Sequence, residues 1–299
     1  MYAYGAVQWL LFFYIYCFLG WCFESTVVSL QERRFINRGF LHGPVVPLYG
    51  TGAVLLLLVA LPLQNQPPAL LFLAGMAAAT VLEYVVGAVM EAVFKVKYWD
   101  YTGHRMQVRG RICLQSSLTW GALTLILTGL IHPPVERLVL RLPGTAALVA
   151  AAAITVLFVS DALLSVRTAL DLARILGELT HLRAQADELR RQLAALAEET
   201  RQRLAEAADG TRERLSETAE TTRERLTEAA QDTREKLSAA AAERMRALQE
   251  ALDASTASYE ERMRKLRLAA KMLVRAYPGA VSRRFGRALE ELKDRLRQR

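Results

Sequence analysis

The chain has few of the residues and none of the short motifs that mark common enzymes. Its three cysteines lack C-x-x-C spacing, and its four histidines lack the spacing of a metal site such as H-E-x-x-H. It also lacks G-x-x-x-x-G-K-S/T, the phosphate-binding loop of ATPases, and G-x-S-x-G, the turn that presents a nucleophilic serine. We therefore expect no metal site and no cofactor, and we assign no catalytic residue. The chain does not carry its own P-loop ATPase.

Charge is sparse in the first half, where long apolar runs dominate. These runs are residues 7–23, 45–63, 69–94, 112–131 and 145–166, and each is close to the ~20 residues that a membrane-spanning helix needs. No basic segment precedes the first run and no small-residue cleavage site follows it, which indicates a retained helix rather than a signal peptide. The pattern predicts an all-α, polytopic membrane protein with a five-helix transmembrane domain over residues 1–166.

Two carboxylates interrupt the third apolar run. Glu83 and Glu91 lie eight residues apart with Gly87 between them, so they share one stripe of the helix. A carboxylate at bilayer depth costs a few kcal/mol, and it usually faces a protein interior or a wet path and has a function. The alternative is a pair of buried carboxylates that only hold helices together.

Basic residues predict the orientation of the spans. Segment 24–44 carries three arginines and segment 95–111 carries five Lys and Arg residues, whereas loop 64–68 has no charge. The basic segments should therefore face the cytoplasm, which places the N-terminus outside and the long C-terminal region inside.

From about residue 167 the composition changes to Ala, Glu, Arg, Leu and Thr. Apolar residues first follow a heptad pattern over 172–196, which favours a coiled coil, and then an 11-residue repeat with one leucine per repeat, which favours a nearly straight helix. We predict one long helical rod over 167–258 that self-associates through 172–196. The open alternatives for the repeat are a solvated spacer and an amphipathic helix on a lipid surface.

The last segment is strongly basic. Residues 260–299 hold 13 Lys and Arg against 5 Asp and Glu, a surplus equal to the whole chain's net charge of +8. The final helix within the terminal region 259–299 also has an apolar face made by Phe285, Leu289, Leu292 and Leu296. A basic amphipathic helix beside a membrane predicts binding to an anionic membrane surface or an acidic protein. No nucleic-acid-binding pattern accompanies the charge.

Polar residues concentrate where the spans meet the basic segments. Gly and Pro at span ends permit an irregular backbone, which is tolerated at membrane depth only when it is buried or lines a cavity. We predict that one polar cluster or path, biased toward the cytoplasmic side, joins five charged residues: Glu24, Arg38, Glu83, Glu91 and Asp100.

The order of motifs in this half resembles a known family. The chain reads GWxxE, NRGFLxGPxxPxYGxG, an intramembrane ExxxGxxxE, and WDY. This string resembles the CmpB-like, ABC-transporter type IV permease family of bacterial membrane proteins, over most of residues 5–166, and the tail 276–293 is similar to that family's C-terminal element. The resemblance implies a bacterial cytoplasmic membrane protein with the rod as an insertion. It adds the supporting positions Asn37, Gly39, Gly43, Pro44, Trp99 and Gly110.

Three classes of function fit this sequence. The first, which the family resemblance implies, is the permease subunit of a transporter. A separate ATPase would dock on segments 24–44 and 95–111, and a homo-oligomer would form the pore. The second is a membrane-embedded enzyme acting on a lipid or isoprenoid head group, with Glu24, Glu91 or Asp100 as acid or base and Arg38 holding an anion. The third is a membrane-anchored coiled-coil scaffold.

Overall fold

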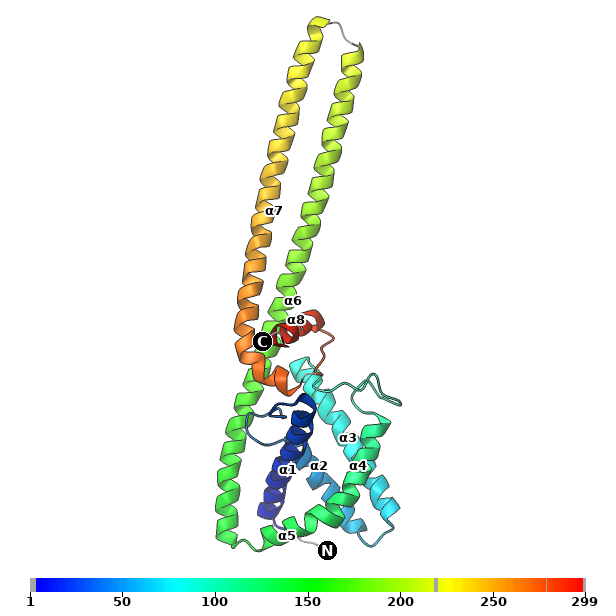
Figure 1. Ribbon diagram of the computed structural model, residues 1–299, viewed down its shortest axis with the longest axis vertical. Coiled ribbons are helices and arrows are strands. Elements are labelled where there is room, and N and C mark those ends of the chain that lie inside the picture. The colour runs from blue at the N-terminus through cyan, green and yellow to red at the C-terminus, as the bar shows by residue number, and fades with distance from the viewer. Residues whose placement is uncertain (1–3, 218–219, 278, 298–299) are drawn as a thin grey trace. The chain divides into compact units, whose positions relative to one another are not determined.

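Helices make up nearly all of the protein (Figure 1). The computed structural model describes residues 4–217, 220–277 and 279–297; Pro278, where a helix break is expected from the sequence, lies outside them. The chain divides into two compact units: Met1–Leu176 with Leu266–Arg299, and Gly177–Lys265.

The first unit contains the apolar helices. They are α1 (Ala6–Glu32), α2 (Pro47–Ala60) continued by the short η1 (Leu61–Leu63), α3 (Pro68–Phe94), α4 (Leu114–Ile126), the π-turn η2 (Leu127–Ile131), α5 (His132–Leu140) and the start of α6 (Gly144–Glu217). Among the described residues, four helical stretches are long and apolar enough to cross a membrane: Ala6–Glu32, Pro68–Phe94, Leu114–Leu140 and Gly144–Leu215. Pro47–Leu63 is a shorter apolar helix. The prediction of an all-α polytopic membrane protein is confirmed.

Local sequence explains where several of these helices begin and why a π-turn precedes α5. Proline stands at the start of α2 and α3, where its missing N–H leaves no hydrogen bond unmade. The Cys113 side chain caps α4 by accepting from the Ser116 backbone N–H. Pro133 and Pro134 cannot donate to the preceding turn, which accounts for the π-turn just before α5.

Small residues let the apolar helices approach closely. Gly20 of α1 faces Tyr49 of α2, and Gly50 faces Cys17, so that a Cβ on either glycine would clash. Gly75 makes the same close contact between α3 and α4. Lipid offers no hydrophobic drive for helix pairing, so this close van der Waals packing supplies much of the association energy.

The third apolar helix has two distinct faces. Leu71, Gly75, Ala79 and Glu83, spaced four residues apart, are buried against the other helices. Val81, Val85 and Val89 are about half exposed or more and form the opposite face, as expected for a surface toward lipid. The stripe that holds Glu83 is thus the inner face of α3.

The second unit is an antiparallel pair of helices. α6 ends at Glu217 and α7 (Glu220–Ala276) begins at Glu220 and returns beside it (Figure 1). The Ser255 hydroxyl donates to the Leu182 carbonyl oxygen at 3.3 Å, and Arg262 pairs with Glu178.

The prediction of one continuous helix over 167–258 is wrong. A stripe with one leucine per 11 residues cannot be buried on an isolated helix, but α6 and α7 each carry such a stripe. Leu196 of α6 and Leu237 of α7 line one groove between the two helices, and Ala207 of α6 and Ala230 of α7 line another. Thr218 and Ala219 of the repeat lie outside the described residues.

The C-terminal segment packs against loop 95–113 within the first unit. Lys97 and Val281 exchange two backbone hydrogen bonds of 2.8 and 3.0 Å, and the Ser282 hydroxyl donates to the Lys95 carbonyl oxygen at 2.7 Å. The last helix, α8 (Gly286–Arg297), follows. Phe285, Leu289 and Leu292 are at most 4% exposed. The apolar face expected to lie on lipid is therefore used for packing within the chain.

Candidate functional site

A cavity of about 460 Å³ lies among α1, α2, α3 and α4. It sits at the end of the bundle that carries loops 33–46 and 95–113, which we call the basic end. The cavity combines charged, polar and aromatic side chains with apolar walls, in the manner of small-molecule sites. Its polar and aromatic lining includes Glu24, Arg38, Tyr49, Glu83, Trp99, Tyr101, His104, Ser116, Trp120 and Tyr277.

Glu24 and Arg38 form an ion pair on one wall of the cavity. Arg38 Nε lies 3.0 Å from Glu24 Oε2, and the Tyr49 hydroxyl donates to Glu24 Oε1 at 2.8 Å. The Arg38 guanidinium also lies 4.6 Å from the centre of the Tyr277 ring and donates to the Ala276 carbonyl oxygen. The C-terminal segment thus completes this wall.

Glu83 of α3 also lines the cavity and is only 5% exposed. It accepts hydrogen bonds from the Tyr101 hydroxyl and from Trp120 Nε1, both at 3.2 Å. Burial raises the pKa of Tyr101, and the charge of Glu83 raises it further, so this phenol remains a donor at neutral pH. Tyr49, which bonds Glu24, and Trp120, which bonds Glu83, are in contact, with ring centroids 5.9 Å apart.

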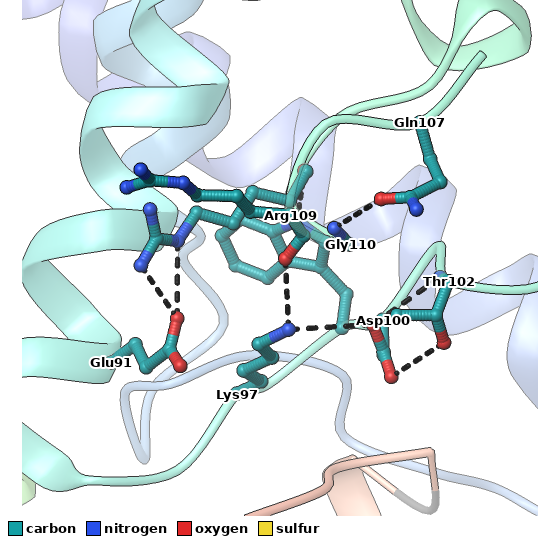
Figure 2. A network of polar contacts seen from close by, with 9 residues as sticks. Glu91, Lys97, Asp100, Thr102, Gln107, Arg109 and Gly110 are labelled. Carbon is teal, nitrogen blue, oxygen red and sulfur yellow. Dashed lines mark hydrogen bonds and ion pairs between the residues drawn. The ribbon is translucent and has the colours of Figure 1, made fainter. Parts of the chain in front are cut away.

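Glu91 and Asp100 do not line this cavity but belong to a neighbouring network (Figure 2). Arg111 donates to Glu91 Oε2 from two nitrogens, at 2.8 and 3.1 Å, and this hydrogen bonding raises the pKa of Arg111. Lys97 Nζ lies 3.7 Å from Asp100 Oδ1 and donates to the Arg109 carbonyl oxygen at 2.9 Å. The Glu91–Arg111 pair holds loop 95–113 against α3, and the contacts of Lys97 with Asp100 and Arg109, labelled in Figure 2, lie within the loop.

Two of the supporting residues shape this loop. The Trp99 indole donates to the Arg111 carbonyl oxygen at 2.9 Å while its ring lines the cavity. Gly110 has a φ of 70°, and an added Cβ would clash with Asp100. The sequence pointed to Asp100 and Trp99, but Lys97 and Arg111 were missed because basic residues there were assigned only to orientation.

The other supporting residues lie in loop 33–46. Asn37 accepts from Trp21 Nε1 at 2.5 Å and donates to the His42 carbonyl oxygen at 2.8 Å, and Gly39 lines the cavity. The Gly43 backbone N–H donates to Asp161 Oδ2 at 2.8 Å. Pro44 is exposed.

Asp161, in the first part of α6, was not singled out by the sequence. It accepts a backbone hydrogen bond from His42 at 3.1 Å as well as the one from Gly43, and Ser165 Oγ lies 2.7 Å from His42 Nδ1. A carboxylate inside an apolar run was the signal available, as it was for Glu83.

Metal binding finds little support here. Among the described residues, no group of three or more His, Cys, Asp and Glu side chains is placed to hold a metal ion. The cavity instead offers hydrogen-bonding groups and aromatic faces, which suit an organic ligand.

The helices and their polar cavity define a polytopic helical membrane protein. Residues 11–166, more than half of the chain, match the family described as "Putative ABC-transporter type IV" (ABC_trans_CmpB), and the chain belongs to this family. The paired helices of the second unit and the C-terminal segment lie outside the matched residues. No curated protein and no solved structure matches the chain.

Proposed function

We propose that this protein is the permease subunit of an ABC-type transporter and that the cavity is where its solute binds. The observation that carries the proposal is that Glu24, Arg38 and Glu83, from three separate segments, line one cavity inside an apolar bundle. Charged groups at this depth usually mark a substrate or ion pathway. Glu91 and Asp100 extend the same polar region along the basic end.

A separate ATPase subunit supplies the energy, because the sequence contains no P-loop. Its docking surface is the basic end, where Phe35 and Met106 are each 75% exposed. The loop that carries Met106 is braced by the Glu91–Arg111 and Lys97–Asp100 pairs, so it can transmit movement to α3. A homo-oligomer encloses the path between copies, since one copy has few spans for a pore.

The orientation we propose places the N-terminus outside a bacterial cytoplasmic membrane and the basic end in the cytoplasm, where an ATPase would be found. The enzyme alternative needs Arg38 to hold an anionic head group. Arg38 is already engaged by Glu24, by the Ala276 carbonyl oxygen and by the Tyr277 ring. The transporter is therefore the better account of this wall.

Affinity purification from native membranes tests this proposal. We expect a P-loop ATPase to co-purify with the wild type and with Glu83→Gln, since Glu83 lies inside the bundle. Replacing Met106 by Glu should reduce the ATPase recovered, because a charge would enter an apolar contact. Mass spectrometry of the eluate and its ATP hydrolysis rate are the readouts. A wild-type eluate with neither an ATPase chain nor ATP hydrolysis would refute the transporter role.

A further inference from the structure

Glu83 is a buried carboxylate without a cationic partner. Among the described residues no Lys, Arg or His forms an ion pair with it, and the donors that reach it, Tyr101, Trp120 and Ser116, are neutral. Glu24 and Glu91 differ, since each is paired with an arginine, at 3.0 and 2.8 Å. An unpaired charge in a low-dielectric site is costly unless a partner joins it.

The cavity therefore holds an acidic side chain that lacks a cation. Arg38 is offset by Glu24, which leaves Glu83 as the acidic residue of the described lining that no basic side chain pairs with. His104 also lines the cavity, and its ring packs edge-on against Tyr101 with centroids 5.4 Å apart. An ammonium group would supply the cationic partner that Glu83 lacks, whereas an anion would not.

The walls around Glu83 are aromatic. Trp120 and Tyr101 both contact the carboxylate and line the cavity, and Tyr49, Trp99 and Tyr277 line it as well. Faces of Trp and Tyr attract cations through the ring quadrupole and also provide apolar contact. A bare inorganic ion would leave most of this surface uncovered.

We infer that the cavity binds a protonated organic amine with an apolar body. Its ammonium group donates to Glu83, which has four lone-pair sites and uses three of them for Tyr101, Trp120 and Ser116. The apolar body packs against the Tyr49 and Trp120 side chains that line the cavity. A volume of about 460 Å³ falls within the range of roughly 300–1,000 Å³ found for small-molecule sites. The claim that this amine is the transported solute rests on the proposed function, whereas the claim that the cavity binds the amine is independent of it.

Isothermal titration calorimetry on the detergent-solubilised full chain tests the inference. The probes are phenylbutylammonium and phenylbutyrate, which share an apolar body and differ in charge. We expect the ammonium probe to bind the wild type and the carboxylate probe not to bind. Glu83→Gln, which keeps the shape of the side chain, should weaken ammonium binding by at least about tenfold, the effect of losing one hydrogen bond to a charged group.

Glu136→Gln is the control, because it removes a carboxylate of α5 that bonds Tyr4 and does not line the cavity. It should leave the affinity for the ammonium probe unchanged. Equal binding by Glu83→Gln, preference for phenylbutyrate, or no ammonium binding to the wild type would each overturn the inference. The comparison of the two probes on the wild type does not depend on how any variant folds. Amine binding without a co-purifying ATPase would refute the transporter role and leave this site standing.

Discussion

Arg38 donates a hydrogen bond to the carbonyl oxygen of Ala276, a residue 238 positions further along the chain. The same guanidinium pairs with Glu24 near the end of α1 and covers the ring of Tyr277. One side chain thus joins the basic end of the apolar bundle to the start of the C-terminal segment. Because Tyr277 lines the cavity, this contact also fixes one of its walls.

Replacing Arg38 by Gln should loosen the C-terminal segment. The variant loses the ion pair with Glu24 and the cation–π contact with Tyr277. Each charged hydrogen bond contributes about 1.5–3 kcal/mol. Hydrogen–deuterium exchange should speed up in residues 279–285 while the centre of α3 stays protected. The control is Arg34→Gln, whose pair with Glu32 is largely exposed and contributes little. Unchanged exchange in Arg38→Gln would show that the hydrogen bonds to Lys95 and Lys97, together with α8, hold the segment without Arg38.

Gly110 should not tolerate a side chain, whereas Gly103 in the same loop should. Gly110 has a φ of 70° and faces Asp100, while nothing lies within 4 Å of a Cβ placed on Gly103. A non-glycine residue in this backbone region costs roughly 1–2 kcal/mol before any clash is counted. Thermal unfolding in detergent should show a lower Tm for Gly110→Ala and no change for Gly103→Ala. Equal Tm values would mean that the loop relaxes freely.

Periodicity and composition predicted the helical class and the approximate place of each apolar helix. Those signals are local: a run of about 20 apolar residues is visible in a window of that length. The convergence of Glu24, Arg38 and Glu83 on one cavity was expected because charges at membrane depth need partners or water. The structure brings these three together and places Glu91 and Asp100 in the adjoining loop network.

The partners of these charges could not be identified from the sequence. Tyr49 and Trp120 looked like ordinary span residues, and their contact with a carboxylate depends on how α2 and α4 pack against α1 and α3. Ala276 contributes only a backbone carbonyl, which every residue has. The return of α7 along α6 was missed for a related reason. An 11-residue repeat gives the shape of a stripe but not whether its partner is another chain or the same one.

Asp161 should be needed to hold loop 33–46. Its carboxylate accepts backbone hydrogen bonds from His42 and Gly43 at 3.1 and 2.8 Å, and its side chain is 19% exposed. Asp161→Asn keeps one oxygen but places an amide N–H against a backbone N–H, so we expect a loss of about 1–3 kcal/mol in stability. Thermal unfolding in detergent measures it. The control is Asp171→Asn, at an exposed position further along α6, which should leave the Tm unchanged.

Cysteine labelling should place the loops on opposite sides of the membrane. In a variant whose three native cysteines are replaced by serine, a cysteine at Asn65 should react with an impermeant reagent added outside intact cells. A cysteine at Arg105 should react only after the membrane is opened. The expectation follows from the excess of Lys and Arg in 24–44 and 95–111 over loop 64–68. The reverse labelling pattern would overturn the orientation and with it the docking side for an ATPase.

The second unit should behave as a hairpin within one chain. Glu178 and Arg262 are 84 residues apart in sequence yet form an ion pair, whereas a straight helix would separate them by roughly 125 Å at 1.5 Å per residue. Replacing both residues by spin-labelled cysteines removes one exposed ion pair, which costs about 0–1 kcal/mol, so the hairpin should persist. Pulsed electron paramagnetic resonance should then report a short distance between the two labels. Dilution with unlabelled protein separates the two possible sources of that signal. A short distance that persists at high dilution comes from one chain folding back on itself. A short distance lost on dilution would instead mean that straight rods associate side by side.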